Sequence, residues 1–222
     1  MDEAHPEPDK ALSWLRDRLT PDTDTWRHVV TEVVPAGFPA YVRVFHSWSV
    51  DGNPEQRSTW REMAEIADAH YHGELTSSPL EPALQTAPTA SRWVVDEGEP
   101  DPQTRDGLVQ VLTGVTSPGQ PVYFSYELAR VVRGQTPIVW KSSLTSLEPV
   151  RAHMGDGFVG PEHWWPEDRS WVVGSDYDLC STYIACSEDL SLRLTSSDQI
   201  EAIMVGPDAR VDNAADNINA RK

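Results

Sequence analysis

Two carboxylates near the C-terminal third of the chain have a spacing that could support acid and base chemistry. On an extended strand, Asp176 and Asp178 would face the same side about 7 Å apart, a separation that suits a proton donor and a proton acceptor. The surrounding run Gly174-Ser175-Asp176-Tyr177-Asp178 is also typical of a turn between two strands. The turn is the favoured interpretation, because carboxylate pairs occur readily by chance in a chain with 35 acidic residues.

Histidines are the second group that could do chemistry. His70 and His72 would share one face of a strand, and His46, His153 and His163 are further candidates to join them around a metal ion. No paired carboxylate stands at ligand spacing beside them, so surface or capping histidines are the favoured interpretation. We expect no metal site and no cofactor.

Most motifs for well-known chemistry do not occur in the sequence. It contains no Walker loop, GxSxG, HExxH, CxxC or EF-hand pattern. Ser181 and Thr182 have no histidine placed by a motif to activate them. The sequence therefore assigns no catalytic residue.

Aromatic residues are concentrated in one segment, which holds three of the nine tryptophans within eight residues. Pro166 suits the first position of a helical turn there, and Asp168 and Arg169 could pair or cap locally. The tryptophans suit a core, a protein interface with Trp and Arg anchors, or a ligand-stacking site. The candidate protein-binding or ligand-stacking residues are Trp164, Trp165, Asp168, Arg169, Trp171, Asp176 and Asp178.

Charge limits the classes of partner. The chain has 18 basic residues against its 35 acidic ones, a formal net charge of −17 and a pI near 4.6. Nucleic acids and anionic membranes are bound through basic surfaces, so neither is an expected partner. A basic protein is expected instead, because opposite charge accelerates encounter.

The sequence also indicates a compartment. Residues 1–9 lack the basic and apolar regions of a secretory signal, which predicts a cytoplasmic protein. The longest uncharged stretch, 107–126, is interrupted by glycine and proline and is not expected to cross a membrane. Cys180 and Cys186 would lie roughly 20 Å apart on one strand, too far for a disulfide.

Several helices are expected to position these groups. Apolar spacing predicts helices over 9–19, 59–69 and 102–112, and favours a helix over 26–34. Ser58 is the expected start of the helix over 59–69. Ser187 opens a further short helix.

Strands are expected over 40–48, 121–126, 137–142, 170–175, 181–186 and 200–205. No helix stands regularly between strands, which predicts an α+β fold with a mixed or mainly antiparallel sheet flanked by helices. The expected organisation is a disordered acidic N-terminus over 1–9, one α+β domain over 10–205 and a flexible tail over 206–222.

Several segments carry a family resemblance. The chain resembles a family of uncharacterised actinobacterial proteins over roughly residues 26–212, through Val34–His46, Trp60–Ala64, Trp164–Trp171, Asp176, Asp178 and Ser181–Tyr183. The resemblance implies a shared fold and a cytoplasmic location, and it implies no activity. The chain departs from the family at His46-Ser47, where the family tends to have His-Pro, and at Ala185-Cys186, where it often has Gly-Gly.

Three functional hypotheses follow. The first is a non-catalytic intracellular protein-binding module, such as an immunity or inhibitor factor for a basic toxin or nuclease. The alternative is a small-molecule enzyme that uses Asp168, Asp176, Asp178 or His46 as proton carriers in a cleft near Trp164–Asp178. The third is an accessory subunit whose tryptophans pack against a second copy of the chain.

Overall fold

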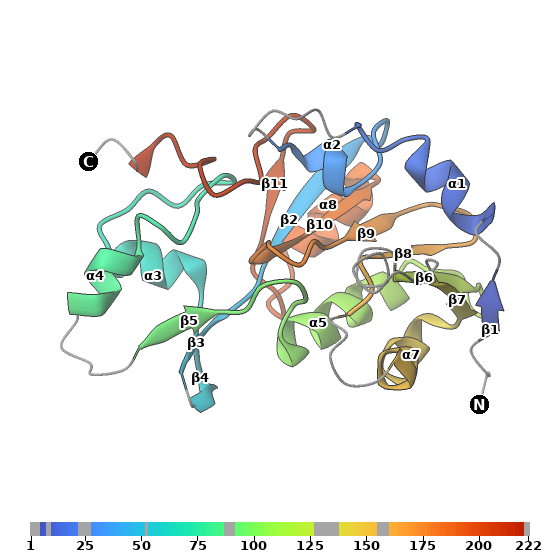
Figure 1. Cartoon of the computed structure of the whole chain (residues 1–222), viewed down its shortest axis with the longest axis horizontal. Coiled ribbons are helices and arrows are strands. Elements are labelled where there is room, and N and C mark those ends of the chain that lie inside the picture. Colours follow the sequence, from blue (N-terminus) through green and yellow to red (C-terminus); the bar gives the residue numbers. More distant parts are fainter. Residues whose placement is uncertain are drawn as a thin grey trace.

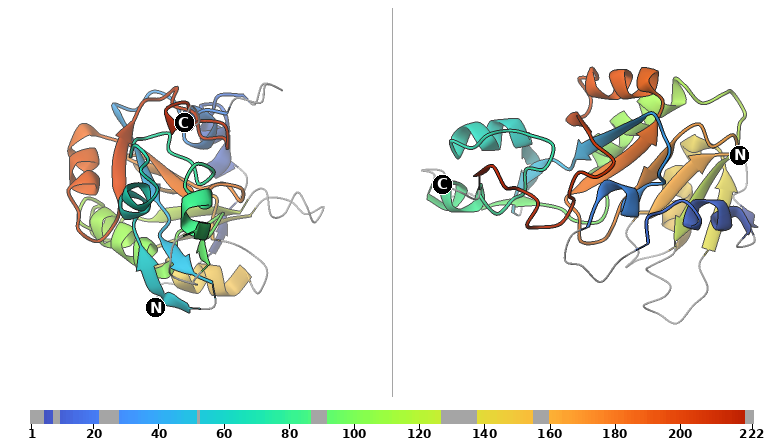
Figure 2. Two further views of the ribbon diagram at one scale, coloured as in Figure 1. Left: turned by 90° about the vertical axis from the view of Figure 1, so that its left-hand side faces the viewer. Right: turned by 90° about the horizontal axis from the view of Figure 1, so that it is seen from above.

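A computed structural model describes residues 5–7, 10–21, 28–51, 53–86, 92–126, 138–154 and 160–219. Its helices and strands form two lobes, a larger one around a long sheet and a smaller one at the left of Figure 1. The right-hand view in Figure 2 shows the same separation from above. The fold class is α+β, as the sequence predicts.

The larger lobe is built on an eight-stranded sheet in which every pairing is antiparallel. Its spatial order is β1 (His5–Glu7), β7 (Ile138–Ser142), β6 (Val122–Tyr126), β8 (His163–Pro166), β9 (Val172–Gly174), β10 (Ser181–Cys186), β2 (Ala40–Phe45) and β11 (Ala202–Val205). All residues of β2 and β10 are buried. These two strands pair with each other and lie inside the sheet, which explains their continuous burial.

Helices cover both faces of this sheet. On one face, α5 (Pro102–Thr113), the 3-10 turn η1 (Leu144–Ser146), α7 (Leu147–Met154) and α8 (Glu188–Thr195) surround a core that includes Ile184. On the other face, α1 (Lys10–Arg16) and α2 (Val30–Val33) pack on a core that includes Tyr183. Adjacent residues of β10 thus serve opposite cores, as the alternation of side chains along a strand requires.

The smaller lobe has a sheet of its own. Its strands are β3 (Trp48–Val50), β4 (Asn53–Ser58) and β5 (Trp93–Val95), in the order β4-β3-β5, and they lie beside α3 (Trp60–Ile66) and α4 (Glu81–Thr86). Trp48, Trp60 and Met63 are fully buried in a third hydrophobic cluster. One domain over 10–205 stays a prediction, and the structure divides its core between two lobes.

Three expected elements differ in the structure. The strand expected over 40–48 ends at Phe45, and β3 begins at Trp48 in the other sheet. Only Val30–Val33 of the helix expected over 26–34 is helical, and residues 22–27 lie outside the described part of the chain. Within the N-terminal segment expected to be disordered, His5–Glu7 forms β1 and pairs with β7.

The C-terminal segment also differs from the flexible tail that the sequence predicts. Residues 206–219 pass from β11 to the smaller lobe, where Ala215, Asp216 and Asn219 are buried. Asn219 accepts a hydrogen bond from the backbone N–H of His70 at 2.8 Å and donates one to its carbonyl at 3.0 Å. The attachment to His70 consists of hydrogen bonds, which hydrophobic periodicity does not reveal.

Two smaller predictions concern membranes and cysteines. Among the described residues, no helix has the length and apolar character to span a membrane. Cys180 and Cys186 are free, with Cys186 buried and Cys180 half-buried. Burial raises the pKa of the Cys180 thiol to about 11, which makes it a poor nucleophile at neutral pH.

Candidate functional site

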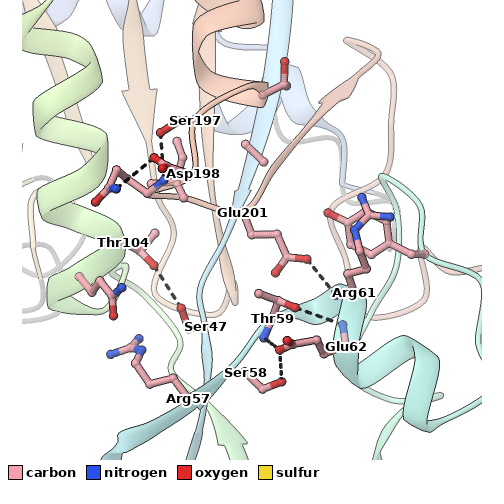
Figure 3. A pocket seen from close by; sticks show the side chains of 16 residues that line it. Ser47, Arg57, Ser58, Thr59, Arg61, Glu62, Thr104, Ser197, Asp198 and Glu201 are labelled. Atoms are coloured by element: carbon pink, nitrogen blue, oxygen red, sulfur yellow. Dashed lines mark hydrogen bonds between the residues drawn. The ribbon is translucent and has the colours of Figure 1, made fainter.

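A polar cleft of about 430 Å³ lies between the two lobes (Figure 3). The smaller lobe contributes residues of β4 and α3, and the larger lobe contributes residues of α5 and of the segment from α8 to β11. Hydroxyl groups are its most frequent polar lining, from Ser47, Ser58, Thr59, Thr104, Thr195 and Ser197. A cavity of this size is in the range of ligand-binding sites, although its lining is more polar than usual.

Two exposed carboxylates, those of Glu62 and Asp198, line the cleft. Glu62 accepts a hydrogen bond from the Ser58 hydroxyl at 2.6 Å and from the backbone N–H of Thr59 at 3.0 Å. These hydrogen bonds lower the pKa of Glu62, and the bond from Ser58 has the largest effect. Asp198 accepts from the Gln199 side chain at 3.0 Å. Within the described residues, no Lys or Arg nitrogen lies within 4.0 Å of either carboxylate, so both are uncompensated negative charges.

The start of α3 holds Glu62 in place. Thr59 is the N-cap: its hydroxyl accepts from the Glu62 N–H at 3.1 Å, while the Glu62 side chain accepts from the Thr59 N–H. This reciprocal arrangement is a capping box. The sequence predicts the helix start at Ser58, one residue too early, because Ser58 and Thr59 can both act as N-caps. Ser58 instead donates its hydroxyl to Glu62.

Glu201 is the half-buried acid of the cleft. Its carboxylate accepts from the backbone N–H groups of Trp60 at 2.6 Å and Arg61 at 2.8 Å, and it also hydrogen-bonds Tyr71. Burial raises the pKa of Glu201 despite these bonds. A carboxyl with a raised pKa in a cleft can serve as a proton donor or acceptor. The same hydrogen bonds hold the first turn of α3 against the larger lobe, so Glu201 also has a structural role.

The two arginines that line the cleft are both engaged. Arg57 of β4 forms an ion pair with Asp101, whose side chain is nearly fully buried. The guanidinium of Arg61 lies 4.3 Å from the centre of the Tyr71 ring, a cation–π contact. Because Arg57 is neutralised by Asp101, the cleft lining as a whole is net negative.

Asp101 joins the two lobes behind the cleft lining, through contacts with Ser47, Arg57 and Thr104. As the N-cap of α5, it accepts from the Thr104 N–H at 2.9 Å and from the Thr104 hydroxyl at 2.7 Å. It also accepts from the backbone N–H of Ser47 at 3.0 Å. Burial opposes ionisation, but these hydrogen bonds together with Arg57 outweigh it and lower the pKa of Asp101. The carboxylate therefore stays charged and holds both lobes.

The tryptophans proposed as interface or stacking residues lie in the core. Trp164, Trp165 and Trp171 are each at most 3% exposed. Trp165 meets Trp14 edge-on at 5.9 Å and stacks on Tyr123 at 5.6 Å. Of the three roles that the sequence left open, only the structural one matches this burial.

The prediction of a helical turn at Pro166 is wrong. Pro166 is the last residue of strand β8, which pairs with β6 over Val122 to Ser125. Trp164 and Trp165 consequently point to opposite faces of the sheet and into different cores. The bulk of neighbouring tryptophans favours a strand buried on both faces, and this outweighs the local signal of the proline.

Asp168 and Arg169 form the turn after β8. Asp168 accepts from the backbone N–H of Ser170 at 2.9 Å, the local capping role that the sequence anticipated. Arg169 has a positive φ of 59° and places its guanidinium 4.7 Å from the Trp14 ring centre. Neither side chain lines the interlobe cleft.

Asp176 and Asp178 lie in a turn, as the favoured interpretation predicts. The Asp176 side chain accepts from the backbone N–H of Asp178 at 3.1 Å, and its carbonyl accepts from the N–H of Leu179 at 3.0 Å. Asp178 is exposed. The two carboxylates are remote from the cleft lining, so the structure does not bring them together with Glu62 or Glu201.

Among the described side chains, the rings of His70 and His72 lie 5.8 Å apart, and the other histidines considered as ligands do not join them. In the described part of the chain, no three His, Cys, Asp or Glu side chains are arranged to hold a metal ion. His46 is fully buried. Nε2 of His163 lies 2.9 Å from the carbonyl oxygen of Val33, and Nε2 of His72 lies 3.1 Å from Oδ1 of Asp216. The side chain of His153 lies outside the described residues.

The sequence does not predict that most of the residues lining the cleft belong to a site. The capping box of Thr59 and Glu62 leaves a local signal, whereas Glu201, Arg57 and Ser47 meet only through the tertiary fold. Fold and site together define a two-lobed α+β protein with a polar, acidic interlobe cleft. The chain matches no protein-family model, no curated protein and no solved structure.

Proposed function

We propose that the chain is a non-catalytic protein-binding module that takes a basic partner protein, and that the interlobe cleft is its contact surface. The observation that carries the proposal is the pair of uncompensated carboxylates, Glu62 and Asp198, at a hydroxyl-lined cleft in a chain of net charge −17. A lysine or arginine of the partner would neutralise them. Immunity or inhibition towards a basic toxin or nuclease, in the cytoplasm, is the biological role that suits this chemistry.

The structural engagement of the ionisable groups supports binding over turnover. Glu62 belongs to a capping box, Arg57 pairs with Asp101, and both oxygens of Glu201 accept backbone hydrogen bonds. Groups held in this way orient a surface and have little freedom to exchange protons with a substrate.

Charge substitution at the cleft tests the proposal. The double variant Glu62→Gln/Asp198→Asn is compared with Asp178→Asn/Asp208→Asn, which removes the same charge at exposed positions outside the cleft lining. Each protein is immobilised and exposed to native lysate at low salt, and captured proteins are identified by mass spectrometry. We expect a basic partner that the control retains, the cleft variant loses at least fivefold and high salt releases. Equal capture by both variants, or capture that high salt leaves unchanged, would contradict the proposal.

A second candidate, a small-molecule enzyme, is favoured by one observation: the raised pKa of Glu201 next to Tyr71 in the cleft. This candidate moves the proton carrier away from the Trp164–Asp178 segment. Native mass spectrometry of the purified protein distinguishes the two functions. A small molecule that co-purifies with the wild type and is lost in Glu201→Gln supports the enzyme, whereas a bare mass supports the binding module.

A further inference from the structure

Two chain crossings that join the lobes run side by side. β2 of the large sheet passes into β3 through His46 and Ser47, and β5 passes into α5 through residues 96–101. The first crossing borders the cleft through Ser47, and the second leads directly into α5, whose Thr104 belongs to the lining. A change in the angle between the lobes must bend these two segments, together with the C-terminal segment 206–219, which also passes between the lobes.

The imidazole of His46 ties the crossings together. Its Nδ1 lies 2.9 Å from the carbonyl oxygen of Asp96 on the other crossing, and its Nε2 lies 3.0 Å from the hydroxyl of Thr182 on β10. The Thr182 hydroxyl in turn lies 2.8 Å from that of Ser175. The backbone N–H of His46 donates to the Cys180 carbonyl at 3.1 Å. One residue therefore connects both crossings to the large sheet.

These partners fix the protonation state of the ring. A carbonyl only accepts, so Nδ1 carries the proton and donates it to Asp96, while Nε2 accepts from Thr182. The Thr182 oxygen then accepts from Ser175. The network is complete for a neutral imidazole and offers no carboxylate partner to a charged one.

The small lobe is fastened to the same point. The indole N–H of Trp60 donates to the His46 carbonyl at 2.7 Å. Ser47 donates its backbone N–H to Asp101, and the Ser47 and Thr104 hydroxyls lie 3.3 Å apart. His46 is fully buried, so the lobes have to part before water can reach its ring.

We propose that His46 is a lock between the two lobes: the neutral imidazole holds the crossings together and keeps the cleft closed, and protonation of the ring opens the cleft. This goes beyond the proposed binding function and does not depend on it. The charged groups that act on the ring are Asp101, which favours the imidazolium, and Arg43, which opposes it. Burial outweighs the other influences and lowers the pKa of His46 to about 4 in the closed form. An open form with a hydrated ring would have the ordinary value of about 6.5.

These two values give the size of the effect. The open form has the higher pKa and therefore binds the proton more tightly. A fall in pH consequently shifts the equilibrium from the closed form towards the open form. Between pH 7.5 and 5, the ratio of open to closed molecules should rise about thirty-fold.

The distance between the lobes tests the lock. Spin labels are placed at Glu65→Cys on α3 and Leu192→Cys on α8, both exposed, in a Cys180→Ala/Cys186→Ala background, and distances are measured by pulsed electron resonance at pH 7.5 and 5. We expect a longer second population at pH 5. In His46→Asn, which can still donate to Asp96 and does not titrate, the distribution should be the same at both pH values.

Two outcomes would overturn the lock: an unchanged distribution in the His46 protein at pH 5, or a pH-dependent shift that persists in His46→Asn. Thr182→Val provides a second test that keeps the histidine. It removes the hydroxyl bonded to Nε2, and we expect a longer population already at pH 7.5. A distribution in this variant identical to that of the parent would count equally against the lock.

Discussion

A carboxylate oxygen of Glu201 lies 2.6 Å from the backbone nitrogen of Trp60, across 141 residues of sequence. The contact joins the residue before β11 of the large sheet to the first residue of α3 in the smaller lobe. It satisfies a backbone N–H at the first turn of α3, which has no partner within the helix. The larger lobe thus completes a helix of the smaller one.

Glu201→Ala should therefore destabilise the protein. The substitution leaves the N–H groups of Trp60 and Arg61 without their acceptor, and we expect a loss of about 1–3 kcal/mol in the free energy of unfolding. Urea denaturation followed by tryptophan fluorescence measures it. The exposed Glu65→Ala on α3 is the control, with an expected change within about 0.5 kcal/mol. A Glu201 variant as stable as this control would show that the contact is dispensable.

The pH dependence of stability should report His46. Its pKa is about 4 in the folded protein and about 6.5 in the unfolded chain. Because the folded value is the lower one, the unfolded chain binds the proton first, so stability is full above pH 6.5 and falls as the pH drops towards 4. The difference corresponds to at most about 3 kcal/mol, since opening of the lobes relieves part of it. Urea titrations at several pH values should show this slope in the wild type and a flatter one in His46→Asn; equal slopes would exclude His46 as its origin.

Local signals predict the elements that begin with a capping residue. Asp101 before Pro102 and Ser187 before Glu188 mark the starts of α5 and α8, and both side chains accept hydrogen bonds from the first helical turn. The sequence predicts strands β6, β7 and β10 within one residue, because each is short and rich in β-branched or aromatic residues. These features act over a few residues and are visible in one sequence.

The cleft depends on contacts that a single sequence does not contain. Glu201 and Trp60 carry no mutual signal, and the partner of His46 on the second crossing is a backbone carbonyl, which every residue has. The prediction around Trp164 fails for the opposite reason. Pro166 is a strong local signal for a helical turn, but pairing of β8 with β6 outweighs it. Composition draws attention to tryptophans and carboxylate pairs, while the site consists of ordinary polar residues.

Gly174→Ala should disturb the contact between β9 and α2. A Cβ at Gly174 would meet the carbonyl oxygen of Val33 well inside van der Waals distance. Because this obstacle is backbone, the helix itself must shift, at a cost of about 1–3 kcal/mol. Thermal unfolding measures the loss, and Gly206→Ala, where the added Cβ meets open space, is the matched control. Equal melting temperatures for the two variants would show that α2 can shift to accept the added Cβ without a loss of stability.

Trp165→Ala separates a core role from an interface role. The side chain is 1% exposed between Trp14 and Tyr123, so its removal should cost about 3–5 kcal/mol and lower the stability of the isolated chain. Arg169→Ala in the exposed turn nearby should cost far less. An interface tryptophan would behave in the reverse manner, with unchanged stability and lost binding. Denaturation of both variants decides between the roles.

The C-terminal segment offers the last test, because one amide, that of Asn219, ties its end to the smaller lobe. Asn219 is 6% exposed and makes a two-bond pairing with the backbone of His70, so Asn219→Ala should leave the N–H and the carbonyl of His70 without this partner. We expect a loss of about 1–3 kcal/mol and faster amide hydrogen exchange over residues 206–219. Ile218→Ala removes an exposed side chain one position away and should leave both measurements unchanged. If residues 206–219 already exchange in the wild type as fast as an unfolded chain, the segment is the flexible tail that its composition predicts, and the pairing with His70 contributes nothing to its docking.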